Sequence, residues 1–479
     1  MNTPDLATAI NATLMPGFTG PELPGWLADQ LGAGLGSVCL FGSNVTDRAQ
    51  LAALTGAIHA ARPATVIAID EEGGDVTRLH HRDGSPHPSA AYLGRLDETG
   101  ATERVGRAIG IELRLAGVDL NLAPVADVNS NPHNAVIGVR SFGADPALVA
   151  RHVGAYIRGL QGAGVAASAK HFPGHGDTTA DSHHELPVVG ASLEELHARE
   201  LAPFRAAVAA GSLTVMTSHL LVPVLDPIMP MTLSRPGLTV LRDELGFEGA
   251  IISDALDMKG VSAERGIPEA AVLALAAGVD LLCLGTRSSA VLLASIRRHV
   301  LDALRDGRLS EARIYQAAGR VASLSAGVAA LRRPVPVDAA AFWTRRPLPP
   351  LVAPVIVRLA SADNMAAGAV PWGIGEHLAG EVAATLPGAT CATASDLDAL
   401  GQLLASHPER PLVVQGRDLH RVEFLAAACA FVRARRPDAV IVDLGWPDIG
   451  DGALADVATF GAGRATALTV LGLLARGMS

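Results

Sequence analysis

Eight short apolar segments alternate with helical patterns through the first part of this 479-residue chain, and this alternation is the feature that most limits its fold. The segments lie at 13–16, 36–41, 65–69, 118–122, 165–169, 213–217, 250–253 and 279–284. Helical patterns fit between several of them, at 102–116, 146–161 and 268–277. Eight strands with intervening helices over about 290 residues is the size expected of a (β/α)8 TIM-type barrel. A doubly wound parallel sheet is the alternative, because periodicity alone does not exclude it.

The alternation stops near residue 330. Residues 331–354 contain six prolines, which is typical of a semi-rigid connection. Beyond them, the segments 355–359, 412–415 and 439–444 resemble parallel strands separated by alanine-rich helices. We therefore expect an α/β chain with a (β/α)8 domain at 1–330, a proline-rich linker at 331–354 and a small α/β sandwich-like domain at 355–479. The glycines of the small domain do not form G-x-G-x-x-G after a strand, so a dinucleotide site is not supported.

Composition narrows the possible partners. Apolar residues make up 49% of the chain and charged residues 18%, as in a soluble globular protein. The formal net charge is −10 and no basic block or arm is present, which disfavours nucleic acid as a partner. No apolar run is long enough to span a bilayer, and the first residues lack the features of a secretory leader. The four cysteines are far apart, in no metal-like spacing, so we expect reduced thiols in a cytoplasmic protein.

Titratable residues gather in one stretch, 169–187, which reads A-K-H-F-P-G-H-G-D-T-T-A-D-S-H-H-E-L-P. A small, apolar segment typical of a buried strand leads into it, and a capping-box pattern at 192–195 predicts a helix after it. The proline and glycines within the stretch favour turns. The sequence therefore predicts a polar loop at the carboxyl end of a buried strand, which is where barrel enzymes place their active sites.

Other polar residues follow other predicted strands. Asp70 follows T-V-I-A-I within D-E-E-G-G-D-V-T-R, and Asp127 and Arg140 flank the loop after the fourth strand. Asp127 fits a structural turn equally well. Asp254 follows G-A-I-I-S, the position in a barrel where a nucleophile or base belongs. Asp257, three residues later, is its rival.

Several of these motifs together resemble glycoside hydrolase family 3, and more narrowly its β-N-acetylglucosaminidase branch. They are K-H-F-P-G-H-G-D-T followed by D-S-H, D-E-E-G-G-x-V-x-R, R-S-F-G and I-S-D-A-L-D-M. The match covers most of residues 10–290, with the motifs in family order. The resemblance implies a (β/α)8-type barrel, net retention of anomeric configuration, and no metal or organic cofactor.

The resemblance also assigns roles to residues. Asp254 would be the nucleophile and His183 the acid/base, with Asp181 as its partner. The residues implied to hold or support the terminal sugar are Asp70, Arg78, Arg140, Lys170 and His171.

Elementary chemistry agrees with this division of roles. Retention needs an anionic nucleophile on one face of the sugar and a proton donor on the other. Histidine titrates near pH 6.5, so it can donate and recover a proton near neutrality. In an extended segment residues i and i+2 point to the same side, so the spacing of D-S-H lets Asp181 contact His183.

The expected activity is that of an exo-acting, retaining β-N-acetylglucosaminidase, a glycoside hydrolase. Aromatic residues are only 4% of the chain, whereas long polysaccharide clefts need stacking platforms, so short substrates are favoured. The resemblance implies release of N-acetylglucosamine from muropeptides or chitooligosaccharides, which would suit cell wall recycling. Phosphate could replace water as the acceptor, which would make the chain a phosphorylase; a β-glucosidase is a weaker alternative.

Two further hypotheses stay open on the sequence alone. The side chains of His171, His175, Asp177, His183 and His184 include a His-x-x-x-His spacing that a zinc-dependent hydrolase could use. The C-terminal domain could be a binding or assembly module, or the entire chain an inactive scaffold. The intact set of catalytic-type residues argues against an inactive scaffold, and we expect the small domain to shape or stabilise rather than react.

Overall fold

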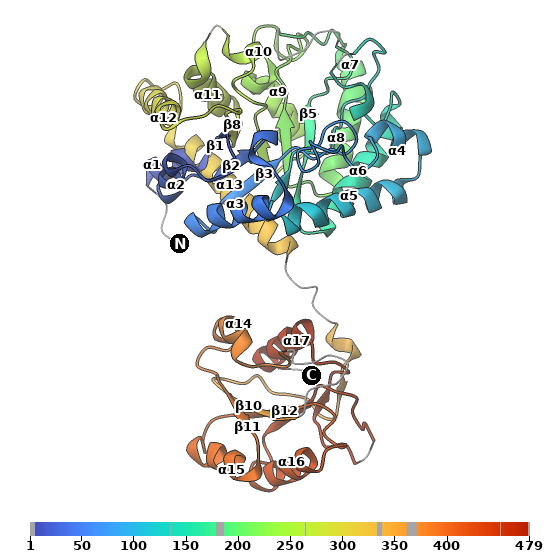
Figure 1. Ribbon diagram of the computed structural model, residues 1–479, viewed down its shortest axis with the longest axis vertical. Helices are drawn as coiled ribbons and strands as arrows, with labels where there is room; N and C mark the ends of the chain where they lie inside the picture. The colour runs from blue at the N-terminus through green and yellow to red at the C-terminus, as the bar shows by residue number, and fades with distance from the viewer. Residues whose placement is uncertain are drawn as a thin grey trace. The chain divides into compact units, whose positions relative to one another are not determined.

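The computed structural model describes residues 5–134, 136–178, 186–263, 265–332, 338–361, 371–450 and 452–477. The chain divides into two compact units, Met1–Arg333 and Pro334–Ser479 (Figure 1). Each unit buries its own apolar side chains, so each has a core of its own.

The first unit is a closed barrel of eight parallel strands. The strands are β1 (Leu14–Met15), β2 (Ser37–Leu40), β3 (Val66–Ile69), β4 (Leu120–Asn121), β5 (Ala166–Phe172), β6 (Thr214–Thr217), β7 (Ala250–Ile252) and β8 (Leu282–Cys283). Strands β2 to β7 pair in chain order, and β1 pairs with β8. Parallel bridges between Gly17 and Cys39 and between Ile252 and Leu281 join the two sheets. The predicted (β/α)8 fold is confirmed, and the doubly wound alternative is wrong for this unit.

Helices surround the barrel. They are α1 (Leu6–Ala12), α2 (Gly25–Gly32), α3 (Arg48–Ala61), α4 (Ala90–Leu96), α5 (Thr99–Leu115), α6 (Pro146–Gly162), α7 (Leu193–Glu195), α8 (Leu201–Ala209), α9 (Arg235–Thr239), α10 (Lys259–Ser262), α11 (Gly266–Ala277), α12 (Ala290–Arg305) and α13 (Glu311–Leu331). Two π-helical turns, η3 (Leu196–Glu200) and η5 (Val240–Glu244), extend α7 and α9. Short 3-10 turns are η1 (Gly42–Asn44), η2 (Gly138–Arg140) and η4 (Met231–Leu233).

Local sequence explains where these helices begin and how closely they pack. Helix α6 begins after Asp145, whose side chain accepts hydrogen bonds from the N–H groups of Ala147 and Leu148, and Pro146 occupies its first position. It packs on α5, where Gly159 lies against the backbone of Glu103 with no room for a Cβ atom. Helices α5 and α6 are thereby held close to each other.

Strand β5 is longer than its apolar segment predicts. The sequence places the end of this strand at residue 169, but the structure continues it to Phe172, so Lys170 and His171 belong to the strand rather than to a loop. The pairing register with β6 shifts between Ala169 and Phe172. Such an irregularity re-aims the side chains around it, and here it falls on the first two polar residues of the stretch.

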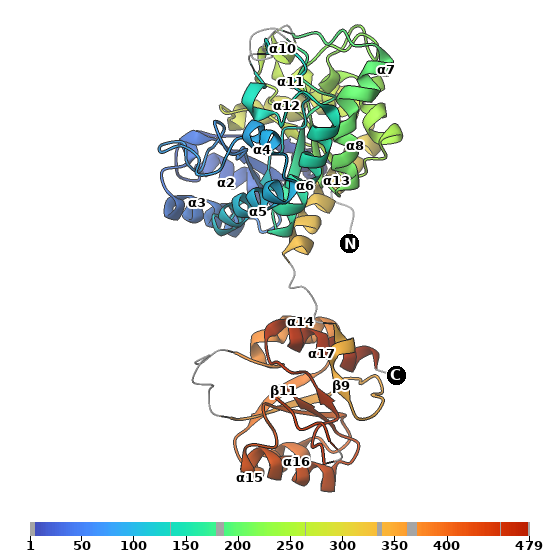
Figure 2. The same ribbon diagram turned by 90° about the vertical axis from the view of Figure 1, so that its right-hand side faces the viewer.

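The second unit is a three-layer α/β sandwich. Its sheet has the order β11-β10-β12-β13-β14-β9, from β9 (Trp343–Thr344), β10 (Val355–Leu359), β11 (Thr390–Ala394), β12 (Leu412–Gly416), β13 (Val440–Asp443) and β14 (Val457–Ala458). Helices α14 (Ala379–Thr385) and α17 (Arg464–Arg476) cover one face, and α15 (Leu397–Ser406) and α16 (Glu423–Arg435) the other (Figures 1 and 2). The turns η6 (Ala339–Ala341) and η7 (Glu376–Leu378) complete the unit.

Most of the expected linker belongs to this second unit. The sequence predicts a linker at 331–354, but Phe342 and Leu348 are buried in the second core. Strand β9 pairs antiparallel with β14 at the edge of the sheet. Prolines are tolerated beside such an edge because the outer side of an edge strand needs no N–H donors. The small domain therefore begins before residue 355.

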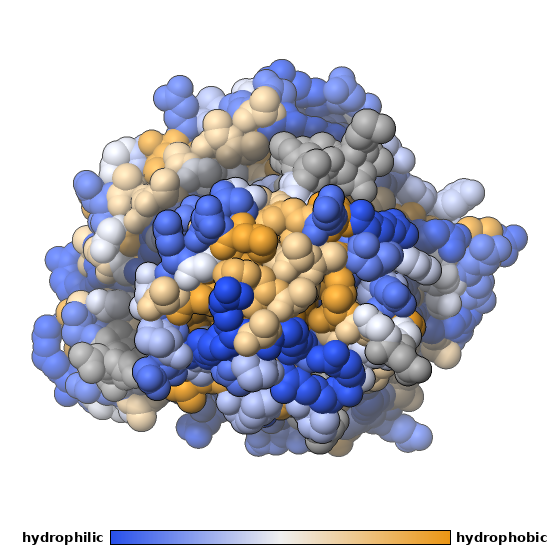
Figure 3. All heavy atoms as spheres, turned by 90° about the horizontal axis from the view of Figure 1, so that it is seen from below, coloured by the Kyte–Doolittle hydropathy of each residue, from blue (hydrophilic) through white to orange (hydrophobic). Residues whose placement is uncertain are grey.

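The outer surface mixes polar and apolar side chains. One face shows apolar atoms gathered among polar ones (Figure 3). Large apolar side chains that are mostly exposed include Leu115 and Val291 in the first unit and Val352 and Trp446 in the second. Single exposed apolar residues of this kind are normal. Within the described ranges, every helix is too short or too polar to cross a bilayer.

Candidate active site

A cavity of about 450 Å³ opens at the carboxyl ends of the barrel strands. Cys39 of β2, Lys170 of β5 and Cys283 of β8 line it, together with Asp70 after β3 and Asp254 after β7. Residues far apart in the sequence meet here because parallel strands bring their carboxyl ends to one end of a barrel. The cavity lies within the size range of small-molecule sites.

Lys170 is the centre of a charged network in this cavity. Its Nζ atom lies 2.7 Å from Oδ1 of Asp70 and 2.7 Å from Oε1 of Glu72. The Arg140 guanidinium binds Glu72 through two hydrogen bonds, from Nε at 2.9 Å and from Nη2 at 2.8 Å. Arg78 approaches the other side of Asp70, with 3.6 Å between Nη2 and Oδ2. Two carboxylates are thus shared among three cations.

Burial makes this network strongly coupled. The side chains of Lys170 and Glu72 are only 3% and 6% exposed. Burial alone would raise the pKa of Glu72, but Lys170 and Arg140 outweigh it and hold the pKa far below its usual range. Burial alone would lower the pKa of Lys170, but Asp70 and Glu72 raise it above its ordinary value. Near neutral pH these two residues are therefore an ion pair.

Asp127 organises the start of the polar stretch. It is fully buried, and its Oδ2 atom lies 2.8 Å from Nδ1 of His171. Its Oδ1 atom accepts hydrogen bonds from the backbone N–H groups of His171 and His175, at 3.1 and 2.8 Å. Burial lowers the pKa of His175, which lines the cavity. Asp127 therefore acts as a structural aspartate, one of the two readings its sequence position allows.

Asp254 lies two residues beyond β7 and lines the cavity. Its Oδ1 atom accepts a hydrogen bond of 2.7 Å from the N–H of Ala255. Burial alone would raise the pKa of this carboxyl, but His219 and His171 and the Ala255 N–H outweigh burial and lower it. Asp254 is therefore an ionised carboxylate that forms no ion pair within the described part of the chain.

The rival carboxylate, Asp257, has a different environment. It is exposed, and its Oδ2 atom accepts a hydrogen bond of 3.3 Å from the N–H of Thr286, beside Gly285. It lines the mouth of the same cavity.

The structure thus brings together six of the eight residues that the sequence predicts for the site. They are Asp70, Arg78, Arg140, Lys170, His171 and Asp254. The predicted acid/base His183 and its partner Asp181 lie outside the described residues, as does His184.

The family follows from comparison with known proteins. The family model "Glycosyl hydrolase family 3 N terminal domain" matches residues 23–324, more than half of the chain. The chain belongs to glycoside hydrolase family 3. Its motif resemblance to this family is confirmed.

Individual relatives agree with this assignment. A "Beta-hexosaminidase" from Tolumonas auensis is 41% identical over 262 residues, which cover 54% of this chain and 78% of the relative. "Beta-hexosaminidase A" from Pseudoalteromonas piscicida is 34% identical over 317 residues, or 60% of this chain, and the match spans only 53% of that relative. The solved structure of a family 3 β-N-acetylglucosaminidase from Paenibacillus is 29% identical, with a TM-score of 0.65 over 98% of this chain and 96% of that one. Its match spans both units, and the relatives together support a glycoside hydrolase.

Two carboxylates of this family 3 chain have roles that the sequence did not reveal. Glu72 binds both Lys170 and Arg140. Glu71 accepts hydrogen bonds from Thr77 and from the N–H groups of Arg78 and Leu79, at 2.8–2.9 Å. The sequence D-E-E-G-G already indicated the position of Glu72. In an extended segment, residue 72 points to the same side as residue 70, so a second carboxylate beside Asp70 was to be expected.

The alternative zinc site of the sequence does not assemble from the described residues. Asp177 pairs with Arg199 at 2.6 Å, and His171 is held by Asp127. Among the residues that the structure describes, the side chains of His171, His175 and Asp177 do not converge as metal ligands do.

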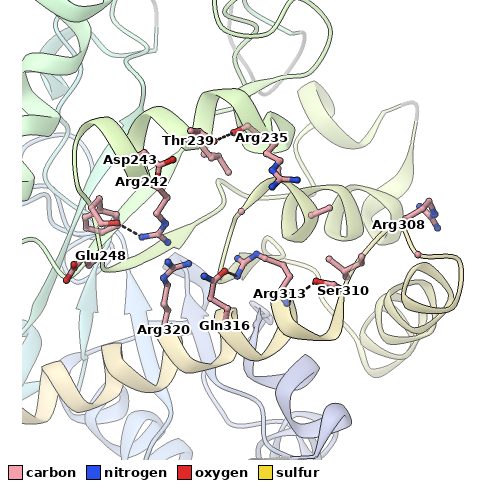
Figure 4. Close-up of a pocket in the computed structure, with 17 residues that line it drawn as sticks. Arg235, Thr239, Arg242, Asp243, Glu248, Arg308, Ser310, Arg313, Gln316 and Arg320 are labelled. Atoms are coloured by element: carbon pink, nitrogen blue, oxygen red, sulfur yellow. Dashed lines mark hydrogen bonds between the residues drawn. The ribbon is translucent and has the colours of Figure 1, made fainter.

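A larger hollow, about 810 Å³, lies at the amino ends of β7 and β8. Arg242, Arg313 and Arg320 point toward one another there (Figure 4). All three pair with the buried carboxylate of Asp280, at 2.7 Å for Arg313 and 3.3 Å for Arg320. Because the Asp280 carboxylate accepts from all of these cations, this network ties α13 and η5 to the barrel. Catalytic chemistry in a barrel is expected at the opposite end.

Proposed function

We propose that this chain is an exo-acting β-N-acetylglucosaminidase that releases terminal N-acetylglucosamine with retention of configuration. The observation that carries the proposal is Asp254, an ionised carboxylate without an ion pair in the described chain, in the same cavity as Lys170 and Asp70. The names of the relatives, β-hexosaminidase and β-N-acetylglucosaminidase, support the sugar class.

In this proposal Asp254 attacks the anomeric carbon and forms a covalent glycosyl-enzyme. Such a nucleophile must be anionic at working pH and must not be neutralised by a bound cation. The lowered pKa of Asp254 meets the first requirement. The network around Lys170 meets the second, because Glu72 and Asp70 engage the cations nearby.

His183 donates a proton to the leaving oxygen in the first step and accepts one from water in the second. Asp181 orients the imidazole and stabilises its charged form. These two assignments rest on the D-S-H motif and on the family to which the chain belongs.

The remaining predicted residues bind the terminal sugar. Asp70 faces the cavity and can accept hydrogen bonds from hydroxyls, while Arg78, Lys170 and His171 can donate them. Arg140 acts chiefly through Glu72, which it binds with two hydrogen bonds. A cavity of about 450 Å³ suits one sugar ring better than a long chain, which supports removal of a single terminal residue from muropeptides or chitooligosaccharides. The proposal includes a cytoplasmic role in cell wall recycling, which rests on the sequence resemblance.

The nucleophile is tested by substitution and trapping. Asp254→Ala should lose nearly all turnover while its circular dichroism stays unchanged. Asp257→Ala, at the exposed neighbouring carboxylate, should keep most activity. A fluoro-sugar inactivator should label the peptide that contains residues 252–254. Labelling at Asp257 would show that the wrong carboxylate was chosen.

The acid/base is tested with leaving groups. His183→Ala should be slowed by about 10²–10⁴-fold on natural oligosaccharides, the usual worth of general acid–base catalysis, and far less on dinitrophenyl glycosides. Azide, which needs no base, should restore turnover and give a β-glycosyl azide. Asp181→Asn should show the same trend more weakly. Equal slowing on all substrates without azide rescue would refute the dyad.

A phosphorylase is the second possibility for the same site. A histidine is neutral after it gives up its proton, so it would not repel incoming phosphate as a carboxylate would. Product analysis with an aryl N-acetylglucosaminide, with and without phosphate, decides between the two. N-acetylglucosamine 1-phosphate as the main product would move this chain out of the hydrolases.

A further inference from the structure

Three metal-ligand side chains meet beside the catalytic cavity but outside it. His80 and His87 lie between β3 and α4, and Glu112 lies on α5. Nε2 of His80 is 2.8 Å from Oε2 of Glu112, and Nε2 of His87 is 3.6 Å from Oε1. The three ligand atoms lie within 4.8 Å of one another. The two imidazole rings pack edge to face, with 6.3 Å between their centroids.

One atom of this cluster lacks a hydrogen-bond partner. Nε2 of His87 is buried and has no hydrogen-bond partner within the described structure, and the side chain is only 13% exposed. Buried polar atoms in proteins nearly always have a partner, and an atom without one can mark the place of a bound ion. This nitrogen lies on the inner side of the cluster, 3.6 Å from the Glu112 oxygen that His80 does not use, which is too far for a hydrogen bond.

We propose that His80, His87 and Glu112 bind one divalent transition-metal ion of the zinc class. Two imidazoles and one carboxylate are a ligand set that Zn²⁺ uses, whereas Mg²⁺ and Ca²⁺ prefer oxygen ligands alone. Bonds of about 2.1 Å allow two ligands of one ion to be at most about 4.2 Å apart, so small side-chain rotations complete the site. The fourth position is left for water.

The Arg48 guanidinium competes with the metal ion for Glu112, but it can move away from the site. Nη2 of Arg48 lies 3.3 Å from Oε1 of Glu112, but the Arg48 side chain is 64% exposed. A surface pair of this kind contributes little, so a metal ion can displace it into solvent.

The ion would fasten the segment after β3 to helix α5. The backbone N–H of His80 donates to the Thr77 hydroxyl, and the carbonyl of His87 accepts from the N–H of Gly74 at 2.9 Å. Both histidines are therefore anchored to the turn that follows Asp70. This turn carries Arg78 toward the cavity, which gives the site a positioning role rather than a catalytic one.

Metal binding to the whole protein tests the proposal. Chelator-treated chain is titrated with Zn²⁺ alone, and with Co²⁺ as a spectroscopic probe. We expect one tightly bound ion per chain, the strong visible absorption of low-coordinate Co²⁺, and a rise in melting temperature with Zn²⁺. His87→Ala and Glu112→Gln should lose all three effects while keeping their circular dichroism; His87→Gln, which keeps the side-chain volume, serves if His87→Ala does not fold.

Two controls make the result specific. His81→Ala removes an exposed histidine next to the cluster, whose Nδ1 lies 3.1 Å from the carbonyl of Arg78, and should bind Zn²⁺ as the unaltered chain does. His183→Ala removes a histidine of the predicted catalytic loop and should also retain the ion. The proposal would be overturned if His87→Ala still bound Zn²⁺ while His183→Ala did not. It would also be overturned if the unaltered chain failed to bind Zn²⁺.

Discussion

Replacing Glu72 by Gln removes one negative charge from the most enclosed part of the site. Lys170 would keep only Asp70 as a charged partner, and Arg140 would lose the carboxylate that binds it at 2.8 and 2.9 Å. Breaking a buried ion pair by removing one partner usually costs about 3–5 kcal/mol, because the other charge stays buried. Because the Glu72 side chain is only 6% exposed, solvent screening should reduce this energetic cost only slightly.

Scanning calorimetry measures this cost as a lower melting temperature for the thermal unfolding of the barrel unit. At about 2.1 cal/mol/K per residue, a unit of 333 residues has an unfolding entropy of about 0.7 kcal/mol/K, so the loss should lower its melting temperature by about 4–7 °C. Glu103→Gln is the matched control. Glu103 is 36% exposed and pairs with Arg158 at 3.3 Å, so its removal should cost less than about 1 kcal/mol.

The pH dependence gives an independent check on the same reasoning. The pKa of Glu72 is far lower in the folded chain than the ordinary value of about 4.3 expected in the unfolded chain. Its stabilising effect is therefore fully present above that value and declines as the pH falls below it. The gap in melting temperature between the unaltered chain and Glu72→Gln should narrow at acid pH. A gap below about 1 °C at pH 7, or one that widens in acid, would refute the ion-pair account.

Three further predictions concern the surroundings of the cavity. Asp127→Asn removes a buried charge and places an NH2 group where Oδ2 meets Nδ1 of His171 at 2.8 Å, so calorimetry should show a loss of about 1–3 kcal/mol, whereas a loss below about 0.5 kcal/mol would contradict its structural role. Gly285→Ala should destabilise the barrel more than Gly307→Ala, because both glycines have φ near +80° but only Gly285 lies against the Asp257 carboxylate; equal melting temperatures would speak against this packing. Because the pKa of Asp254 is lowered, the acid limb of kcat/KM for a dinitrophenyl glycoside should lie below the range usual for an aspartate, and a limb above that range would count against Asp254 as the nucleophile.

The sequence predicted the barrel well because its strands are short, apolar and bounded by turns. The segment predicted at 250–253 corresponds to β7 at Ala250–Ile252, and in the second unit the segment predicted at 355–359 corresponds to β10 at Val355–Leu359. The prediction failed at β5, where the polar residues Lys170 and His171 continue the strand. Polarity alone suggested a loop. The carboxylates that allow Lys170 to be buried follow a different strand, so the sequence around Lys170 does not reveal them.

The same reason explains what was missed in the site. Position at a strand end identified Asp70 and Asp254, because a carboxylate there faces the barrel mouth. It did not reveal that Glu72 rather than Asp70 holds Arg140, since that choice depends on where the loop after β4 returns. The linker prediction failed likewise, because β9 pairs with β14, more than 100 residues later, and no local pattern records that pairing.

The charges in the cavity support Asp254 as the proposed nucleophile among several carboxylates. Glu72 binds Lys170 and Arg140 closely enough that it has little freedom to attack a substrate. Asp70 is held by Lys170 on one side and approached by Arg78 on the other, so it is positioned to accept hydrogen bonds from hydroxyls. Asp254 accepts a hydrogen bond from its neighbour's N–H and is kept ionised by more distant positive groups. A nucleophile needs this combination of charge without a bound cation, and among these three carboxylates only Asp254 has it.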